Sequence, residues 1–397
     1  MKSHIRNTRD TGLDLLRFVA LCLMIFAHFP ISEDSNIVIF VKFIARSAPA
    51  LFFFAFGMTF QHFARKENTL KLRIAVVFLV IALLHNLAFT GNLIHYEFFF
   101  FLWFAQIFMT LVFTLSKRPL YLCVVLFTLI IAFWILFPKV MLAAPLKIGI
   151  QGNFPFLPWL CFVLAGFIFS HRRKSNFILP ALFLLIALLL HVSSASNFAI
   201  QKYPLSISYF LLFTGVSMII YYAGAFLPDL SRSKMIVFLS KNLLIATILH
   251  YVTFTILNIL HQPVKHFIGI DFIARYPGTA ILLAPILCLS ILVVLVYVAT
   301  YLWRIIHQGR IMQQWFLPHT LKLAVLIVGA SYFISRTITE PADSMFRFLF
   351  IFWMAFFGMV LREAKCSEKI DIDMLYSFIR QAFIHRHVKF SSTKESE

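Results

Sequence analysis

The stretch LDLLRFVALCLMIFAHFP, residues 13–30, decides the fold because it is an almost unbroken apolar run of membrane-spanning length. Similar apolar runs of about 17 to 25 residues recur along the chain, and each can cross roughly 30 Å of hydrocarbon. Of the 397 residues, 61% are hydrophobic and only 13% are charged, which is too little charge for a soluble surface. Backbone groups in lipid must be hydrogen-bonded within their own segment, so these spans are expected to be helices. The sequence therefore predicts an all-α, polytopic membrane helix bundle.

The apolar runs predict ten to twelve transmembrane helices in a single polytopic domain over residues 1–361. A short polar tail follows at 362–397 and carries no predicted chemistry. The expected helices cover residues 14–30, 44–63, 73–90, 95–115, 119–137, 155–170, 177–193, 203–227, 235–259, 278–303, 320–335 and 343–361.

The distribution of basic residues predicts the orientation of the chain. The N-terminus, the tail and the loops that would share their side hold 26 of the 35 lysines and arginines, and the opposite loops hold eight. Cytoplasmic loops carry the excess of positive charge, so both termini are expected in the cytoplasm. The formal charge of +19 then reflects topology and attraction to anionic lipid, and nucleic acid is not an expected partner.

The cysteines give no sign of a metal site or a disulfide. All five are scattered, without the spacing of a metal or redox motif, and four lie in apolar runs where a thiol behaves as a small hydrophobe. We expect no metal and no permanently bound cofactor.

The first span carries two ionisable residues, Arg17 and His28, eleven positions apart. At 100° per residue they share one helix face and lie about 16 Å apart along the axis. Asp14, three residues before Arg17, is a natural partner on the same face. Ionisable residues within spans are candidates for function, although near the ends of a span they also simply reach the interface.

Five segments, in this order along residues 13–252, carry a family resemblance. They are LDLLRFVALCLMIFAHF, RSAPALFFFAFGMTF (46–60), NFPFLPWLCFVLAGF (153–167), KYPLSISYFLLFTG (202–215) and LSKNLLIATILHYV (239–252). The first and last resemble segments of both the acyltransferase-3 family and the heparan-α-glucosaminide N-acetyltransferase-like family. The middle three resemble the second family or a bacterial relative of it. The chain departs from these patterns at Leu205, where a second proline is usual, and at His28, where some members carry asparagine.

The resemblance implies a membrane acyltransferase that moves an acyl group, with acetyl expected, from acyl-CoA to a carbohydrate or glycolipid acceptor at the extracytoplasmic face. His28 is the expected base, because histidine is the usual base for acyl transfer, and Arg17 faces the cytoplasm, where acyl-CoA arrives. The expected location is a bacterial inner membrane, and a homodimer is compatible with this reading. O- and N-acylation both stay open.

The donor- and acceptor-binding candidates lie on the predicted outer side or within the spans. Arg46 and Lys202 are cations that could hold an anionic group, or else snorkel to the interface. The aromatic rings could stack on a sugar or belong to an interfacial belt. His250, deep in its span, is either a satisfied core histidine or a second member of the reaction centre. The set is Arg46, Trp159, Lys202, Tyr203, Ser206 and His250.

Two alternatives remain beside this interpretation. An acyltransferase-3 type O-acyltransferase of a surface polysaccharide or lipopolysaccharide differs only in the acceptor. A secondary transporter would share the layout of twelve spans, but transporter halves usually show an internal repeat, and no convincing repeat relates residues 1–200 to 201–397.

Overall fold

The computed structural model describes residues 9–29, 36–63, 68–90, 95, 97–137, 154, 156–171, 177–193, 205–268, 277–308, 326–332 and 343–364. Within these ranges every regular element is a helix and no strand is present. Several of these helices are apolar enough to cross a membrane. The chain is therefore an all-α, polytopic integral membrane protein, as its apolar runs predict.

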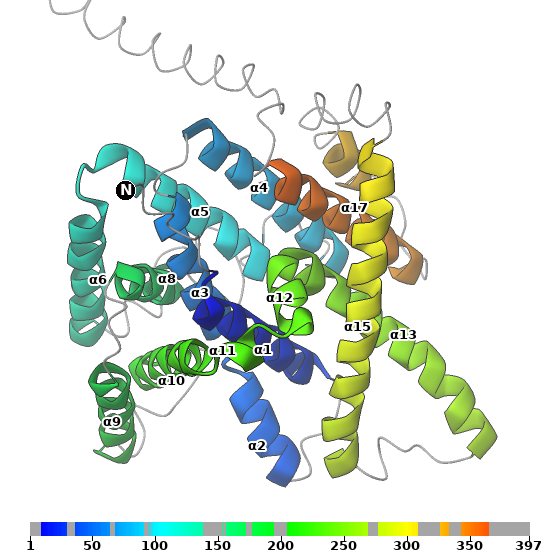
Figure 1. Ribbon diagram of the computed structural model, residues 1–397, viewed down its shortest axis with the longest axis horizontal. Helices are drawn as coiled ribbons and strands as arrows, with labels where there is room; N and C mark the ends of the chain where they lie inside the picture. Colours follow the sequence, from blue (N-terminus) through cyan, green and yellow to red (C-terminus); the bar gives the residue numbers. More distant parts are fainter. Residues whose placement is uncertain are drawn as a thin grey trace, which may run out of the picture.

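Figure 1 shows the helices as one packed bundle around α1. Their bounds are α1 Thr11–His28, α2 Asn36–Ala45, α3 Ala48–Phe63, α4 Asn68–Thr90, α5 Phe98–Leu115, α6 Pro119–Leu136, α8 Phe156–His171, α9 Ile178–Ser193, α10 Ile207–Phe226, α11 Pro228–Ser231, α12 Lys234–Lys241, α13 Leu243–Ile268, α15 Pro277–Gln308 and α17 Asp343–Ala364.

Six helical segments of the described chain are long and apolar enough to cross a membrane, or seven if α12 and the first part of α13 count as one bent span. Four shorter apolar helices, at 74–89, 156–171, 178–192 and 349–360, lie where four other spans are predicted. Of the predicted span 320–335, the described part covers 326–332 and is helical. Length alone thus accounts for six or seven of the ten to twelve predicted spans.

Two predicted helix boundaries are wrong. The segment before residue 44 is itself helical and forms α2, which ends at Ala45. The turn Arg46–Ser47 separates it from α3, so the predicted helix 44–63 begins at Ala48 instead. The predicted helix 235–259 is broken at Asn242 into α12 and α13, whose axes are bent by 95°. The Asn242 amide donates to the carbonyl of Phe238 at 2.9 Å, and side-chain bonding of this kind competes with helical geometry.

Helices α3 and α8 cross with their backbones in close contact. A Cβ atom on Gly57 would overlap the carbonyl oxygen of Val163 across the crossing, and a Cβ on Gly166 would overlap the carbonyl oxygen of Phe54. Lipid tails are as apolar as leucine, so helices in a membrane associate through tight packing, which small residues permit. These two glycines therefore set the distance between α3 and α8.

A similar contact holds α1 against α10. A Cβ atom on Gly12 would lie 2.5 Å from the carbonyl oxygen of Tyr221, and a Cβ on Gly224 would lie 2.9 Å from the Cα of Gly12. Both distances are shorter than real Cβ contacts, so side chains at these positions would separate the helices. Because α1 also packs against α3, the two glycine contacts fix α1 within the bundle.

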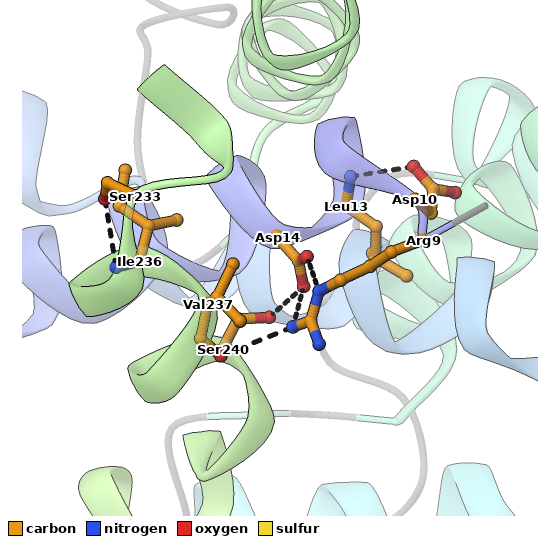
Figure 2. Close-up of polar contacts among 8 residues, drawn as sticks. All are labelled: Arg9, Asp10, Leu13, Asp14, Ser233, Ile236, Val237 and Ser240. Carbon is orange, nitrogen blue, oxygen red and sulfur yellow. Dashed lines mark hydrogen bonds and ion pairs between the residues drawn. The ribbon is translucent and has the colours of Figure 1, made fainter. Parts of the chain in front are cut away.

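A polar network ties the first turns of α1 to α12 (Figure 2). The buried Asp14 carboxylate forms an ion pair with Arg9 and accepts a hydrogen bond of 2.6 Å from the Ser240 hydroxyl. Arg9 also donates to the carbonyl of Val237 at 3.3 Å. Asp10 caps α1 by accepting from the Leu13 amide at 3.1 Å. This network joins the start of α1 to the segment that leads into α13.

We predict that Gly166→Ala destabilises the protein, because the added methyl group forces α3 and α8 apart. Overpacking of this kind typically costs about 1–3 kcal/mol. The measurement is the apparent melting temperature of the detergent-purified protein, followed by size-exclusion chromatography after heating. Gly329→Ala is the matched control, since a Cβ there meets nothing within 4 Å. Equal melting temperatures for the two variants would contradict the glycine contact.

Candidate active site

The last residue of α1, His28, lies beside His250 of α13. The centroids of the two imidazole rings are 5.3 Å apart, and the ring planes are inclined by 47°. The His28 side chain is at the surface of the bundle, whereas that of His250 is buried. The structure thus brings together the two histidines that sequence analysis selects, from segments more than 200 residues apart in the chain.

The hydrogen bonding of His250 fixes its tautomer. Its Nδ1 atom contacts the carbonyl oxygen of Thr247, one turn earlier on α13. A carbonyl oxygen only accepts, so Nδ1 carries the proton. The neutral ring then holds its lone pair on Nε2, which is buried and has no hydrogen-bond partner among the described residues. His250 therefore presents an unprotonated ring nitrogen in a buried position.

Tyr251 and His85 extend this pair into a cluster. The Tyr251 ring lies 3.9 Å from the His250 ring and 5.9 Å from the His28 ring, measured between centroids. The Tyr251 hydroxyl lies 3.3 Å from Nε2 of His85 on α4, within hydrogen-bond distance. Three helices, α1, α4 and α13, thus contribute four titratable side chains to one cluster. We call His28, His85, His250 and Tyr251 the histidine–tyrosine cluster.

The start of α5 lies at the edge of the histidine–tyrosine cluster. His95 Nδ1 and a Glu97 carboxylate oxygen are 3.2 Å apart, and both side chains are largely buried. The amide of Asn86, next to His85 on α4, donates to the carbonyl of His95 at 3.0 Å. Glu97 is close enough to Tyr251 to act on it electrostatically. These contacts link the histidine–tyrosine cluster to the residues just before α5.

Aromatic side chains pack around the histidine–tyrosine cluster. Phe89 lies 4.5 Å from the Tyr251 ring, Phe99 lies 5.1 Å from the His85 ring and Phe254 lies 5.8 Å from the His250 ring, measured between centroids. Such a lining lowers the local dielectric constant, so charge that develops inside interacts strongly with nearby polar groups. The arrangement has the parts of an acid–base site: an accessible histidine, a buried histidine and a phenol.

Arg17 lies on α1, eleven residues before His28, and is partly exposed. Asp14, its expected partner, attracts it at longer range, but the ion pair of Asp14 is with Arg9. The expected Asp14–Arg17 pair is therefore wrong, because the Asp14 carboxylate is bound by Arg9 and Ser240 instead. The separation of Arg17 from His28 along α1 is that of an unbroken helix, about 16 Å.

The remaining described candidates lie outside the histidine–tyrosine cluster. Arg46 sits in the turn before α3 with its side chain exposed, and its carbonyl accepts from the Tyr209 hydroxyl at 2.5 Å. Trp159 is fully buried among Phe53, Phe154 and Tyr209, so its ring is covered by protein rather than open to a sugar.

Ser206 has a structural role as the N-cap of α10. Its hydroxyl accepts from the Tyr209 amide at 3.1 Å, which satisfies one donor of the first turn. Lys202 and Tyr203, the two candidates that precede it, lie outside the described residues.

His85 and Tyr251 are not among the site residues predicted from the sequence. His85 follows eleven apolar or small residues of α4 and is followed by Asn86, and polar residues at that depth of a span are expected to be functional or paired. That signal was available in the sequence. Tyr251 carried none, because a tyrosine beside a histidine in an apolar helix is ordinary, and only the meeting of α4 with α13 gives it a partner.

Comparisons with protein-family models, with curated proteins and with solved structures find no match to this chain. Among the described residues, no three histidine, cysteine, aspartate or glutamate side chains are arranged to hold a metal ion.

We predict that cysteines placed at positions 28 and 250 cross-link readily. The five native cysteines are first replaced by alanine, and His28→Cys/His250→Cys is then treated with a short bis-methanethiosulfonate reagent. The control is His28→Cys/Ile259→Cys, because residue 259 lies nine positions further along α13, about 13 Å away. Mass spectrometry of the joined peptides measures the yield. Equal yields for the two pairs would show that the end of α1 does not meet α13 at residue 250.

Proposed function

We propose that the protein is an integral membrane acyltransferase that transfers an acetyl group from acetyl-CoA to a carbohydrate or glycolipid acceptor. The transfer takes place at the histidine–tyrosine cluster, with His28 as the base. The proposed location is the inner membrane of a bacterium, with the cluster toward the extracytoplasmic face. The lipid bilayer, acyl-CoA and the glycan acceptor are the proposed partners.

The observation that carries this proposal is the 5.3 Å approach of the His28 and His250 rings. The family resemblance selects these histidines separately, one at the end of the first span and one in a late span. Neither motif requires that they meet. Their meeting in a largely apolar surround supports an acid–base centre over two unrelated interfacial histidines, because a histidine buried in a span is costly unless it has a function or a partner.

The chemistry of the proposed transfer needs few groups. His28 accepts the proton of the acceptor hydroxyl or amine as its oxygen or nitrogen attacks the thioester carbonyl carbon. The carbon–sulfur bond of the tetrahedral intermediate then breaks, and the CoA sulfur leaves as its thiolate. The protonated histidine returns the proton to that sulfur, so the products are the acylated acceptor and free CoA. His250, with its lone pair on Nε2, orients the acceptor or shares the proton with His28.

The position of Arg17 supports a donor that enters from the cytoplasm. With both termini inside, the start of α1 faces the cytoplasm and His28 lies at the opposite end of the same helix. An extended pantetheine arm could span the interval of about 16 Å between them. Arg17 would then attract the phosphates of CoA, since guanidinium groups bind phosphate well.

Secondary transport is the second candidate, and one observation favours it. The break of 95° between α12 and α13 resembles the discontinuous helices that line transporter sites. A transporter would bind its substrate near this break without transferring an acyl group. Within the enzymes, an acyltransferase-3 type O-acyltransferase of a surface polysaccharide or lipopolysaccharide is the alternative acceptor class.

We predict that His28→Ala lowers acetyl transfer by about 10²- to 10⁴-fold, the usual contribution of a positioned general base. The measurement is the transfer of radiolabel from acetyl-CoA to mixed bacterial glycans by the detergent-purified protein. His191→Ala is the matched control, because His191 is an exposed histidine at the end of α9. Elution as a single size-exclusion peak establishes that each variant folds.

Two results would count against the proposal in different ways. Unchanged turnover in His28→Ala would remove His28 as the base. A wild-type protein that neither binds acetyl-CoA nor transfers label would reject acyl transfer itself and favour transport.

A further inference from the structure

Acyl transfer requires a hydrogen-bond donor as well as a base. When the acceptor attacks, the thioester carbonyl oxygen becomes an oxyanion, and an aimed donor commonly stabilises this charge. His28 acts as the base in the proposed reaction, so it is not the donor to the oxyanion. His250 cannot serve, because its one N–H is committed to the Thr247 carbonyl and its other nitrogen carries a lone pair.

The described residues around the two histidines include one further side-chain donor in direct contact with both rings, the hydroxyl-bearing Tyr251. We propose that the Tyr251 hydroxyl donates a hydrogen bond to the acyl oxygen and stabilises the oxyanion. This inference rests on the proposed function and assigns Tyr251 as a second catalytic residue.

The contacts of Tyr251 hold its ring in place. Its ring lies 3.9 Å from the His250 ring and 4.5 Å from the Phe89 ring, measured between centroids, so residues of both α13 and α4 contact it. The Tyr251 ring also lies 5.9 Å from the His28 ring and 5.9 Å from the His85 ring, measured between centroids, so it contacts both of these histidines. A donor fixed before the reaction needs no reorganisation when charge develops, which is what makes such groups effective.

His85 acts as a positioning residue for Tyr251. Its Nε2 lies 3.3 Å from the phenolic oxygen. In the tautomer with the proton on Nε2, His85 donates to that oxygen and leaves the phenolic hydrogen to point at the substrate. The donation also polarises the phenol, because linked hydrogen bonds strengthen one another. Among the described residues, His28, His95 and His250 lie close enough to act electrostatically on His85, and Glu97 lies close enough to act on Tyr251.

In the reaction, Tyr251 gains and loses no atom. The acceptor oxygen or nitrogen forms its bond to the carbonyl carbon while His28 takes the proton, and the oxyanion accepts the Tyr251 hydrogen bond. As the carbon–sulfur bond breaks, the carbonyl reforms and the hydrogen bond weakens. His28 delivers its proton to the departing sulfur, which balances the step without an additional reactant.

The first test is Tyr251→Phe, which removes the hydroxyl and keeps the ring. We expect kcat to fall by about 10²- to 10³-fold, as for the loss of one oxyanion donor, with little change in the KM for acetyl-CoA. Tyr222→Phe is the matched control, because Tyr222 is a buried tyrosine of α10 packed against Phe169 and Phe177, away from the histidines.

A spectroscopic measurement tests the hydrogen bond without turnover. The probe is a ketone analogue of acetyl-CoA in which a methylene group replaces the thioester sulfur, labelled with ¹³C at the carbonyl. A hydrogen bond moves the carbonyl resonance of the bound analogue downfield. We expect this shift in the wild type and in Tyr222→Phe, its loss in Tyr251→Phe and its reduction in His85→Phe.

The outcomes separate this inference from the function on which it rests. An active wild type whose Tyr251→Phe variant keeps both its kcat and the carbonyl shift would overturn the role of Tyr251 alone. A wild type that binds neither acetyl-CoA nor the analogue would overturn acyl transfer, and the assignment of Tyr251 with it. Loss of kcat and of the shift together, in a variant that still binds the analogue, is the expected result.

Discussion

The bundle depends on the close contact between the backbones of α3 and α8 at Gly57 and Gly166. Association of helices in lipid rests on shape, because moving an apolar side chain from lipid to protein gains little free energy. The crossing of α3 and α8 supplies a rigid pair, and α1 packs on α3 while Gly12 seats it against α10. The position of α1 then fixes where its last residue, His28, meets α13. The candidate site therefore depends on glycines far from it in the chain.

The polar groups of the bundle divide between the two ends of α1. At its start, Asp14, Arg9 and Ser240 join α1 to α12 and so to the beginning of α13. At its end, His28 meets His250, Tyr251 and, through Tyr251, His85. The first group is a closed network of an ion pair and hydrogen bonds, which suits a structural role. The second leaves Nε2 of His250 without a hydrogen-bond partner among the described residues, which suits a role toward a substrate.

Much of the helical, membrane-spanning fold could be predicted from the sequence, because the length and composition of an apolar run determine whether it forms a membrane helix. The prediction failed where a local side chain or a distant partner decides the outcome. Asn242 bends a span that hydropathy predicts as continuous, and Arg9 takes the carboxylate assigned to Arg17. His28 and His250 were selected by their motifs, but their contact, and the whole role of His85 and Tyr251, depends on which helices pack together. Helical periodicity describes one helix at a time and carries no information on such pairs.

The most direct test of the proposed acyl-transfer centre is an electron cryomicroscopy structure of the protein with the ketone analogue of acetyl-CoA bound. We predict that the carbonyl group lies between the His28 and His250 rings and that the phosphates of the analogue lie toward the Arg17 end of α1. An analogue bound elsewhere in the bundle, with nothing between the two histidines, would contradict it.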